Sequence, residues 1–219
     1  MLSQGQVGPI SSTADGVQVA LRAGKLGEQI VSQLHGNYYE QAYRGQLFSI
    51  GSSTVALSAN TVSLTATTTP IVGVYNPVGS GKNLVLLKGK CVIVTAGNSA
   101  VAPGAFVWAT SINNPAISTG LNPLNRLTLA NTGSVAKGFA GATALTGLTN
   151  NLVIQQAASF GTLVAAQGAT ATPMISGDAL EEFDGALIVP PGGVLALLNT
   201  VSTTTISVAS MLLWEEVPL

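Results

Sequence analysis

A glycine-rich segment with one lysine comes nearest to a known chemical motif in this sequence. Val78-Gly79-Ser80-Gly81-Lys82-Asn83 has the composition of a phosphate-binding loop. The complete motif requires a glycine five residues before its second glycine, and a serine or threonine directly after the lysine. Asparagine stands at both places, as Asn76 and Asn83, and a strand rather than a helix is expected to follow. We therefore interpret the segment as a hairpin turn.

Four carboxylates form the one acidic cluster, at Asp178, Glu181, Glu182 and Asp184. Paired carboxylates can hydrolyse glycosides, and clustered ones can hold calcium. Only one aromatic residue, Phe183, lies beside them as a possible platform for a sugar. We expect these residues to form a solvated loop in front of a strand over residues 186–190.

The chain has a single histidine, His35, and a single cysteine, Cys91. Metal sites combine several such ligands, and no Gly-x-Ser-x-Gly motif is present to position a nucleophilic serine. Cys91 lies in a strand-like run and is expected to be a buried, inert thiol with no disulfide within the chain. We therefore expect no enzyme activity, no cofactor and no metal site.

The best candidates for an interaction site are Tyr38, Tyr39, Tyr43 and Arg44, because tyrosine and arginine are enriched at the centres of protein interfaces. They follow Leu34 and His35 in the N-terminal 45 residues, which hold three of the four tyrosines. We interpret residues 1–45 as an arm that docks on partner subunits. The alternative, in which the tyrosines fold back on their own domain, remains open.

Regular structure in the arm is expected to be weak. Residues 1–20 are polar and rich in glycine, and an apolar helical spacing appears only further on, at Leu26, Ile30, Val31 and Leu34. Gly27 and Gly36 limit that helix to about two turns, which is marginal for an isolated helix. The arm therefore needs a partner surface to become ordered.

Residues 46–219 have the pattern of a single β domain. Short runs of valine, isoleucine, leucine and threonine alternate with glycine, proline and asparagine turns, and no helical periods lie between them. This pattern predicts an all-β, antiparallel β-sandwich. The expected strands cover residues 53–58, 61–66, 71–75, 83–96, 105–111, 125–130, 152–157, 160–166, 186–190, 193–199 and 204–216.

Two of these strands alternate clearly between apolar and polar residues. In 204–216 the even-numbered residues, which include Val208, Leu212 and Trp214, form the more apolar face. In 85–93 the odd-numbered residues from Val85 to Ile93 are predicted to face the core. Lys88 and Lys90 are on the other face, which is expected to meet solvent or a partner.

Three long stretches carry no Asp, Glu, Lys or Arg, namely residues 45–81, 91–125 and 138–177. Charged residues make up 8% of the chain, against about 25% in an ordinary soluble domain. Mixed surface charge normally keeps a free monomer soluble. We therefore expect copies of the chain, or a larger assembly, to cover much of the β domain.

The net charge of −1 and the scattered basic residues give no basis for binding nucleic acid. No membrane span is expected, because prolines and glycines at 190–193 interrupt the apolar run 186–198. Residues 1–6 lack the basic start and apolar core of a signal peptide, so assembly in a host cytoplasm is expected.

Several segments resemble structural proteins of tailed bacteriophages. They are residues 34–41, Arg44-Gly45, Asn76-Pro77 with 79–88, and Val189-Pro190-Pro191-Gly192-Gly193 before a long final strand, which is similar to the last hairpin of a jelly-roll domain. The resemblance implies a capsid decoration (cement) protein on the outer surface of the virion. It also implies a homotrimer with a jelly-roll-like body, and an arm that binds the major capsid protein.

An alternative hypothesis is a receptor- or carbohydrate-binding module of a head or tail fibre, since a fold alone does not determine function. Such a module needs an exposed aromatic or asparagine-rich groove. Trp108 with Asn113 and Asn114 is the best candidate for one.

Overall fold

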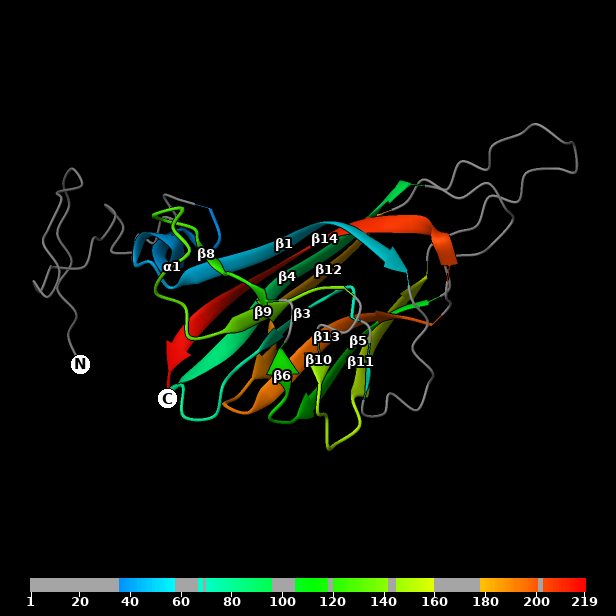
Figure 1. Cartoon of the computed structure of the whole chain (residues 1–219). Helices are drawn as coiled ribbons and strands as arrows, with labels where there is room; N and C mark the ends of the chain where they lie inside the picture. The colour runs from blue at the N-terminus through cyan, green and yellow to red at the C-terminus, as the bar shows by residue number, and fades with distance from the viewer. Residues whose placement is uncertain are drawn as a thin grey trace, which may run out of the picture. The chain divides into compact units, whose positions relative to one another are not determined.

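The computed structural model describes residues 36–57, 67–68, 70–95, 105–117, 120–141, 145–159, 178–200 and 203–219. The chain divides into two compact units, Met1–Tyr39 and Glu40–Leu219. The second unit contains all the described strands (Figure 1). It also contains residues 40–45, which the sequence analysis assigned to the arm.

The second unit is built from antiparallel sheets. A five-stranded sheet has the order β12 (Asp178–Val189), β4 (Lys82–Thr95), β14 (Thr203–Pro218), β1 (Leu47–Leu57) and β8 (Leu124–Asn125). A six-stranded sheet has the order β11 (Val153–Ser159), β5 (Ala105–Ile112), β13 (Gly193–Asn199), β3 (Val72–Tyr75), β9 (Lys137–Phe139) and β7 (Gly120–Leu121). A small sheet contains β2 (Thr67–Thr68), β10 (Leu145–Thr146) and β6 (Ala116–Ile117).

The long strands pair in a nested order. The first, β1, pairs with the last, β14, and β3 pairs with β13. Inside these pairs β4 pairs with β12, and β5 pairs with β11. The chain therefore runs like one long antiparallel hairpin that has been folded across two sheets.

The main core lies between the two large sheets. Phe48 of β1 and Trp214 of β14 stack with their ring centroids 6.4 Å apart. They belong to the same buried cluster as Phe106 and Trp108 of β5 and Leu195 of β13, which come from the other sheet. An antiparallel β-sandwich, as predicted, is therefore confirmed.

A second core lies on the other side of the six-stranded sheet. Val194, Ala196 and Leu198 of β13 pack there with Phe139 and Leu145. Because alternate residues of a strand point to opposite faces, β13 is buried on both of its faces. This explains why the sequence of β13 is almost continuously apolar rather than alternating.

Residues 113–152, between β5 and β11, form an insertion that covers part of the sandwich. The described parts of this insertion supply β6 and β10 over the six-stranded sheet. They also add β8 to the edge of β1, and β9 to the edge of β3. The insertion thus covers one face of the six-stranded sheet, and it covers one edge of each large sheet.

A buried carboxylate holds the insertion to the last strand. The Glu216 side chain is completely buried and accepts hydrogen bonds from Lys82 Nζ at 2.9 Å and Ser134 Oγ at 2.5 Å. It also accepts one from the backbone N–H of Val135 at 3.0 Å. Since a buried charge without partners is very costly, Glu216 fixes the loop at 134–135 against β14.

The variant Glu216→Gln is expected to lower the free energy of unfolding by about 2–3 kcal/mol, because it replaces a buried charged acceptor that three partly buried donors share. Urea denaturation measures this loss. The control is Glu182→Gln, which disrupts an exposed pair with Lys88 and should change stability little. Equal effects of the two variants would contradict the role given to Glu216.

Most of the predicted strands are confirmed. Those at 71–75, 83–96, 105–111, 152–157, 193–199 and 204–216 correspond to described strands, with ends that differ by at most two residues. The strand predicted at 53–58 is the second half of β1, and the one at 186–190 is the end of β12. Those predicted at 61–66 and 160–166 lie outside the described residues.

The strand predicted over 125–130 is wrong, because residues 126–128 form a turn. The side-chain oxygen of Asn125 accepts hydrogen bonds from the backbone N–H groups of Leu127, at 2.9 Å, and Thr128, at 3.2 Å. These bonds close the chain into a turn that competes with strand pairing.

In β14 the even-numbered residues from Val208 to Trp214 are buried, as the more apolar face predicts, whereas the predicted alternation in β4 holds only in part. Gly89 and Cys91 are buried while Lys88 and Lys90 are outside. A register shift between the pairs Leu213–Lys88 and Trp214–Leu86 then reverses the pattern. The core residues before this bulge are therefore Leu84 and Leu86.

Gly89 marks a close contact between the two large sheets. A Cβ atom at this position would overlap the ring of Trp108 and lie 3.2 Å from the ring of Phe183. These two rings pack edge to face, with centroids 5.4 Å apart. The absence of a side chain at position 89 thus permits this aromatic pair.

The variant Gly89→Ala is expected to destabilise the fold by about 1–3 kcal/mol, since the added methyl group forces Trp108 aside. The matched control is Gly51→Ala in β1, where the nearest atom to the added carbon is a carbonyl oxygen at 3.6 Å. Thermal or urea unfolding of both variants checks this. An unchanged stability for Gly89→Ala would show that the sheets can separate without cost.

Candidate functional site

The structure describes four of the six residues that were predicted to dock on a partner. Leu34 and His35 lie outside the described residues. Tyr38 has a positive φ of 65°, and the side chains of Tyr39 and Tyr43 are 44% and 64% exposed. Tyr39 and Tyr43 are the ends of the short helix α1 (Tyr39–Tyr43). The structure does not test docking, so these residues remain candidates.

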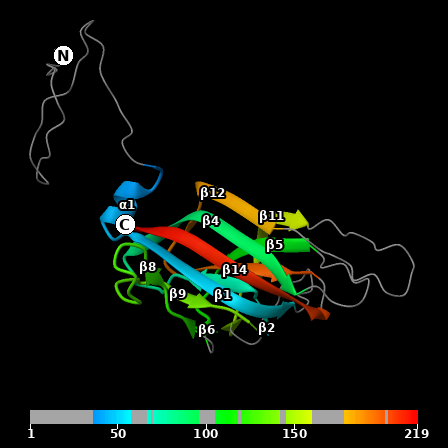
Figure 2. The ribbon, with the colours of Figure 1, turned by 90° about the horizontal axis from the view of Figure 1, so that it is seen from above.

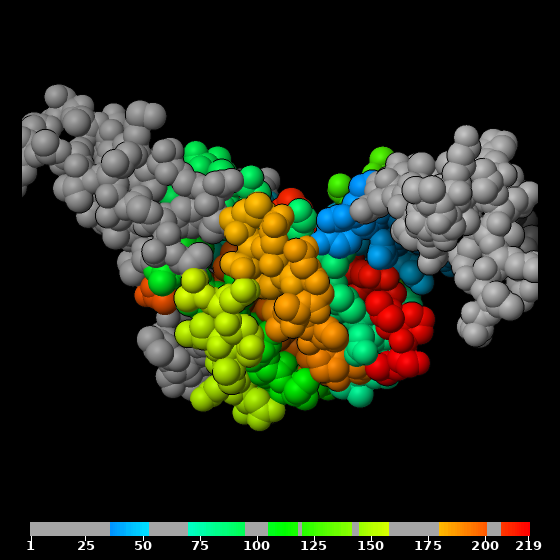
Figure 3. Space-filling model, turned by 180° about the vertical axis from the view of Figure 1, so that it is seen from behind, coloured from blue at the N-terminus to red at the C-terminus, as the bar shows by residue number. Residues whose placement is uncertain are grey.

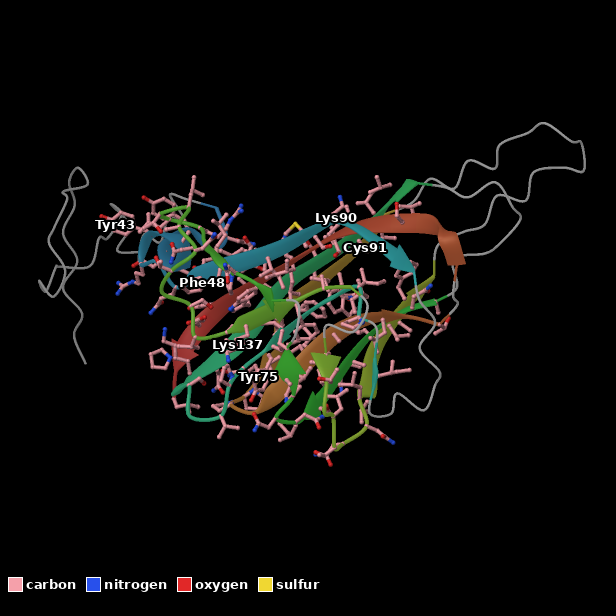
Figure 4. The ribbon with its side chains drawn as sticks, viewed as in Figure 1. Tyr43, Phe48, Tyr75, Lys90, Cys91 and Lys137 are labelled. Atoms are coloured by element: carbon pink, nitrogen blue, oxygen red, sulfur yellow. The ribbon has the colours of Figure 1, made fainter. Side chains whose placement is uncertain are left out.

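The turn that carries Tyr43 and Arg44 is fixed to the β domain (Figure 4). Arg44 donates from Nε to Glu40 Oε1 at 2.6 Å, one helical turn earlier. Gly45 then adopts the left-handed conformation, with φ of 68°, that commonly ends a helix. Its carbonyl accepts a hydrogen bond from Asn125 Nδ2, and the carbonyl of Gln46 accepts one from the backbone of Glu216.

This anchoring gives Tyr43 a defined position at the start of β1. Its ring is mostly exposed although the backbone beside it is held at Gly45 and Gln46. An exposed tyrosine on a fixed backbone loses little conformational freedom when it binds, which favours its use at an interface.

The glycine-rich segment at 78–83 is a turn between β3 and β4, as interpreted from the sequence. Gly79 and Gly81 have positive φ angles of 80° and 70°, and the N–H of Ser80 bonds the carbonyl of Pro77. Lys82 is the first residue of β4, and its ammonium group contacts Glu216. Lys82 therefore stabilises the protein's own structure.

The acidic cluster was predicted to form a loop, and this prediction is wrong. The four residues lie within β12. Glu182 accepts a hydrogen bond from Lys88 Nζ at 2.7 Å. This hydrogen bond and the negative charge of Glu182 raise the pKa of Lys88. Glu181 accepts one from Gln156 of β11, the strand that lies beside β12 at the surface (Figure 3). Strand pairing with β4 overrides the low strand preference of acidic residues here.

Two of the three residues of the patch that was considered for carbohydrate binding, Trp108 and Asn113, are buried. Trp108 is 4% exposed and packs against Phe183. Asn113 is buried, and its side chain bonds Ser111, Thr149 and Asn150. Asn114 is exposed, but its side-chain oxygen accepts a hydrogen bond from Tyr75. These residues do not form an open groove around Trp108.

Cys91 is a buried thiol, as predicted. Burial raises its pKa to about 12, so the reactive thiolate is scarce at neutral pH. Figure 4 labels Cys91 and its neighbour Lys90 on β4, which lie on opposite faces of the strand.

A large surface that the sequence analysis did not identify as a unit is the outer face of the five-stranded sheet, which we call the open face (Figure 2). Its residues alternate with core residues, and direct cross-strand partners share it. It comprises Leu180, Glu182 and Ile188 of β12, Val85, Lys88, Lys90, Val92 and Val94 of β4, and Ala209, Met211, Leu213 and Glu215 of β14.

The open face combines exposed apolar side chains with four charged residues, Glu182, Lys88, Lys90 and Glu215. Leu180, Ile188, Val92, Val94 and Met211 are all exposed. A sheet with one face in water normally carries polar residues there. A group of exposed apolar side chains on one face of a sheet is a candidate interaction site.

Glu215 lies on the open face between Leu47 and Val85, its direct partners on the neighbouring strands. Partial burial raises the pKa of Glu215 above its ordinary value of 4.5. A raised carboxyl pKa means that the folded state binds the proton more tightly than the unfolded state, so the ionised group destabilises the fold.

The variant Glu215→Gln is therefore expected to be more stable than the wild type at pH 7. The difference should shrink as pH falls toward 4.5, because the folded wild type takes up its proton in this range. Urea denaturation across the pH range measures this difference in the free energy of unfolding. At about pH 3, below the pKa of Glu215 in both the folded and the unfolded state, the difference should be smallest, which provides the control. A wild type that is more stable than the variant at pH 7 would contradict the assignment.

No family model, no curated protein and no solved structure matches the chain. Among the described residues, no three histidine, cysteine or acidic side chains are grouped as ligands of a metal ion. In the same part of the chain, no helix is long and apolar enough to cross a membrane.

Proposed function

We propose that this chain is a structural, non-enzymatic subunit of a bacteriophage virion, a capsid decoration (cement) protein. Its partners are the major capsid protein and other copies of itself, on the outer surface of the capsid. The observation that carries the proposal is the group of exposed apolar side chains on the open face, in a chain of which only 8% of the residues are charged. Such a surface is suited to burial against neighbouring molecules rather than to catalysis.

The strand pairing supports a jelly-roll body in this proposal. In a jelly roll, two sheets are built from eight strands that form two Greek keys. Here the long strands pair first with last, and so on inward to β5 with β11. Jelly rolls are common in viral capsid proteins, although the fold also serves other functions.

In the proposed mechanism, residues 1–45 dock on the capsid lattice and the β domain projects from it. The docking residues are Leu34, His35, Tyr38, Tyr39, Tyr43 and Arg44. Copies that are joined to one another, as in the homotrimer implied by the resemblance, engage several capsid sites at once. Each site can then be weak while the whole assembly is held firmly, because the second contact forms at a high effective concentration.

The alternative of a receptor- or carbohydrate-binding module receives less support. Trp108, the centre of its candidate groove, is buried. A decoration protein requires no such groove, so the burial of Trp108 favours the first proposal.

Replacement of the fixed interaction residues tests the docking function. The double variant Tyr43→Ala with Arg44→Ala should bind purified capsids at least tenfold more weakly than the wild type, because tyrosine and arginine are enriched among the few interface residues whose replacement by alanine costs about 2 kcal/mol or more. Co-sedimentation with capsids over a range of protein concentrations measures the loss.

The control is Val78→Ala, an exposed apolar residue in the turn between β3 and β4. It should bind capsids like the wild type. Deletion of residues 1–39, the first compact unit, should abolish binding while circular dichroism still reports a folded β protein. Undiminished co-sedimentation of the deletion variant would overturn the docking role of the N-terminal residues.

A further inference from the structure

The two large sheets end in four edge strands, which are β12 and β8 in the five-stranded sheet and β11 and β7 in the six-stranded sheet. An edge strand presents unpaired backbone N–H and C=O groups that can pair with another chain. Proteins protect such edges with very short strands, charged side chains, prolines or bulges. The four edges of this protein differ in how far they are protected.

Three of the edges are protected. β7 and β8 contain only two residues each, so they offer almost no backbone to a further strand. β12 carries Glu181, Glu182 and Asp184, and its pairing with β4 is irregular between Glu182 and Leu187. A further chain therefore finds little regular, uncharged backbone at these edges.

β11 lacks most of this protection. It has seven residues, none of which is charged or a proline. Residues 153–157 are all exposed, including Val153 at 60% and Ile154 at 42%. Its pairing with β5 is irregular between Ile154 and Gln156, and regular pairs then run from Gln156 to Ser159. Among the described strands, β5 is the only one that pairs with β11, so the other side of its backbone is an edge.

One carboxylate lies beside this edge without a counter-charge. Gln156 is the direct partner of Trp108, a residue of the main core, so its side chain points toward the five-stranded sheet. Its Nε2 donates a hydrogen bond there to Glu181 Oε1 at 2.7 Å, where β11 and β12 lie side by side (Figure 3). Lys88 neutralises the next residue, Glu182, but none of the ion pairs among the described residues includes Glu181. The rim between β11 and β12 therefore carries an uncompensated negative charge.

We propose that β11 binds an extended segment of another protein, which adds a strand to the six-stranded sheet. The segment is uncharged where it pairs with β11, and it carries a lysine or arginine opposite Gln156. Side chains directly opposite one another on neighbouring strands have Cβ atoms about 4.5–5.5 Å apart, so this basic side chain can reach Glu181. In strand addition the backbone hydrogen bonds supply affinity and alternate side chains supply specificity. The inference goes beyond the proposed function and does not depend on it.

The charge of Glu181 favours a basic segment over a second copy of β11. Antiparallel pairing of two β11 strands requires a two-fold axis perpendicular to the sheet, which keeps the corresponding layers of the two copies on the same side. The β12 strands of both copies would then lie at one junction, with a Glu181 carboxylate from each. Two like charges repel each other there, whereas a basic side chain is attracted.

A synthetic peptide tests the inference on the full chain. The probe is Thr-Val-Thr-Lys-Thr-Val-Thr with a neutral fluorophore at its N-terminus and an amide at its C-terminus, so that only the lysine is charged. Fluorescence anisotropy measures its dissociation constant. With saturating peptide, hydrogen exchange of the β11 amides should be at least tenfold slower, and exchange in β8 should be unchanged. The same peptide with alternate backbone amides methylated, which cannot form the strand pairing, should not bind.

Replacement of the carboxylate tests the charge. Glu181→Gln should raise the dissociation constant of the lysine peptide about two- to fivefold, as expected for the loss of one partly exposed ion pair. It should not change the dissociation constant of a peptide with glutamine in place of lysine. The matched control is Glu182→Gln, which removes the same charge from the next residue, where the side chain pairs with Lys88. It should affect neither peptide, and circular dichroism verifies that both variants are folded.

The possible results distinguish this inference from its alternatives. Absence of binding at millimolar peptide, equal binding of the methylated peptide, or binding without slower exchange in β11 overturns it. Equal affinity of Glu181→Gln and the wild type for the lysine peptide overturns the basic partner. A wild type that doubles its mass and protects β11 without peptide assigns the edge to a second copy and also overturns the inference. Failure of the wild type to bind capsids overturns the proposed function and leaves this inference standing.

Discussion

The structure depends on how each sheet of the sandwich is covered. The two large sheets bury the aromatic core between them, with Phe48 and Trp214 on one side and Phe106 and Trp108 on the other. The six-stranded sheet is then covered again by the insertion, so that β13 is buried on both faces. Glu216 fixes the insertion through Lys82, Ser134 and Val135. Removing the insertion would therefore expose a second apolar surface.

This double burial accounts for the unusual composition of the chain. A strand between two apolar layers has no face on which charged residues are useful, and part of the charge-free sequence lies in β3, β5 and the insertion. Part of the low charge is thus explained within one molecule. Double burial does not explain the exposed apolar residues of the open face. In the proposed assembly, neighbouring molecules cover these residues.

The β fold was predictable because its strands carry local signals. The strand 193–199 was identified with its correct ends, since Pro190-Pro191-Gly192-Gly193 stops the preceding strand and an apolar run follows. The first half of β12 was missed, because its acidic residues are typical of loops and only pairing with β4 makes them a strand. The bulge beside Leu87 could not be predicted from the sequence either, since the register of a strand depends on its partner strand.

The sequence predicted individual residues of the candidate site, but not how they are held together. The types of Tyr43 and Arg44 indicated an interface, but their attachment through Gly45 to Asn125 joins residues far apart in the sequence. Trp108 looked like a binding residue, yet Gly89 on another strand provides the space that buries it. The open face required the pairing of β12, β4 and β14 before its residues could be seen as one surface.

The central claim is that neighbouring molecules, rather than water, cover the apolar surface of this domain. Sedimentation equilibrium of the purified wild-type chain over a wide concentration range tests it most directly. The account predicts a mass that is a multiple of 22.0 kDa at high concentration and that falls on dilution. A soluble single copy of 22.0 kDa at every concentration, which also ignores capsids, would contradict it.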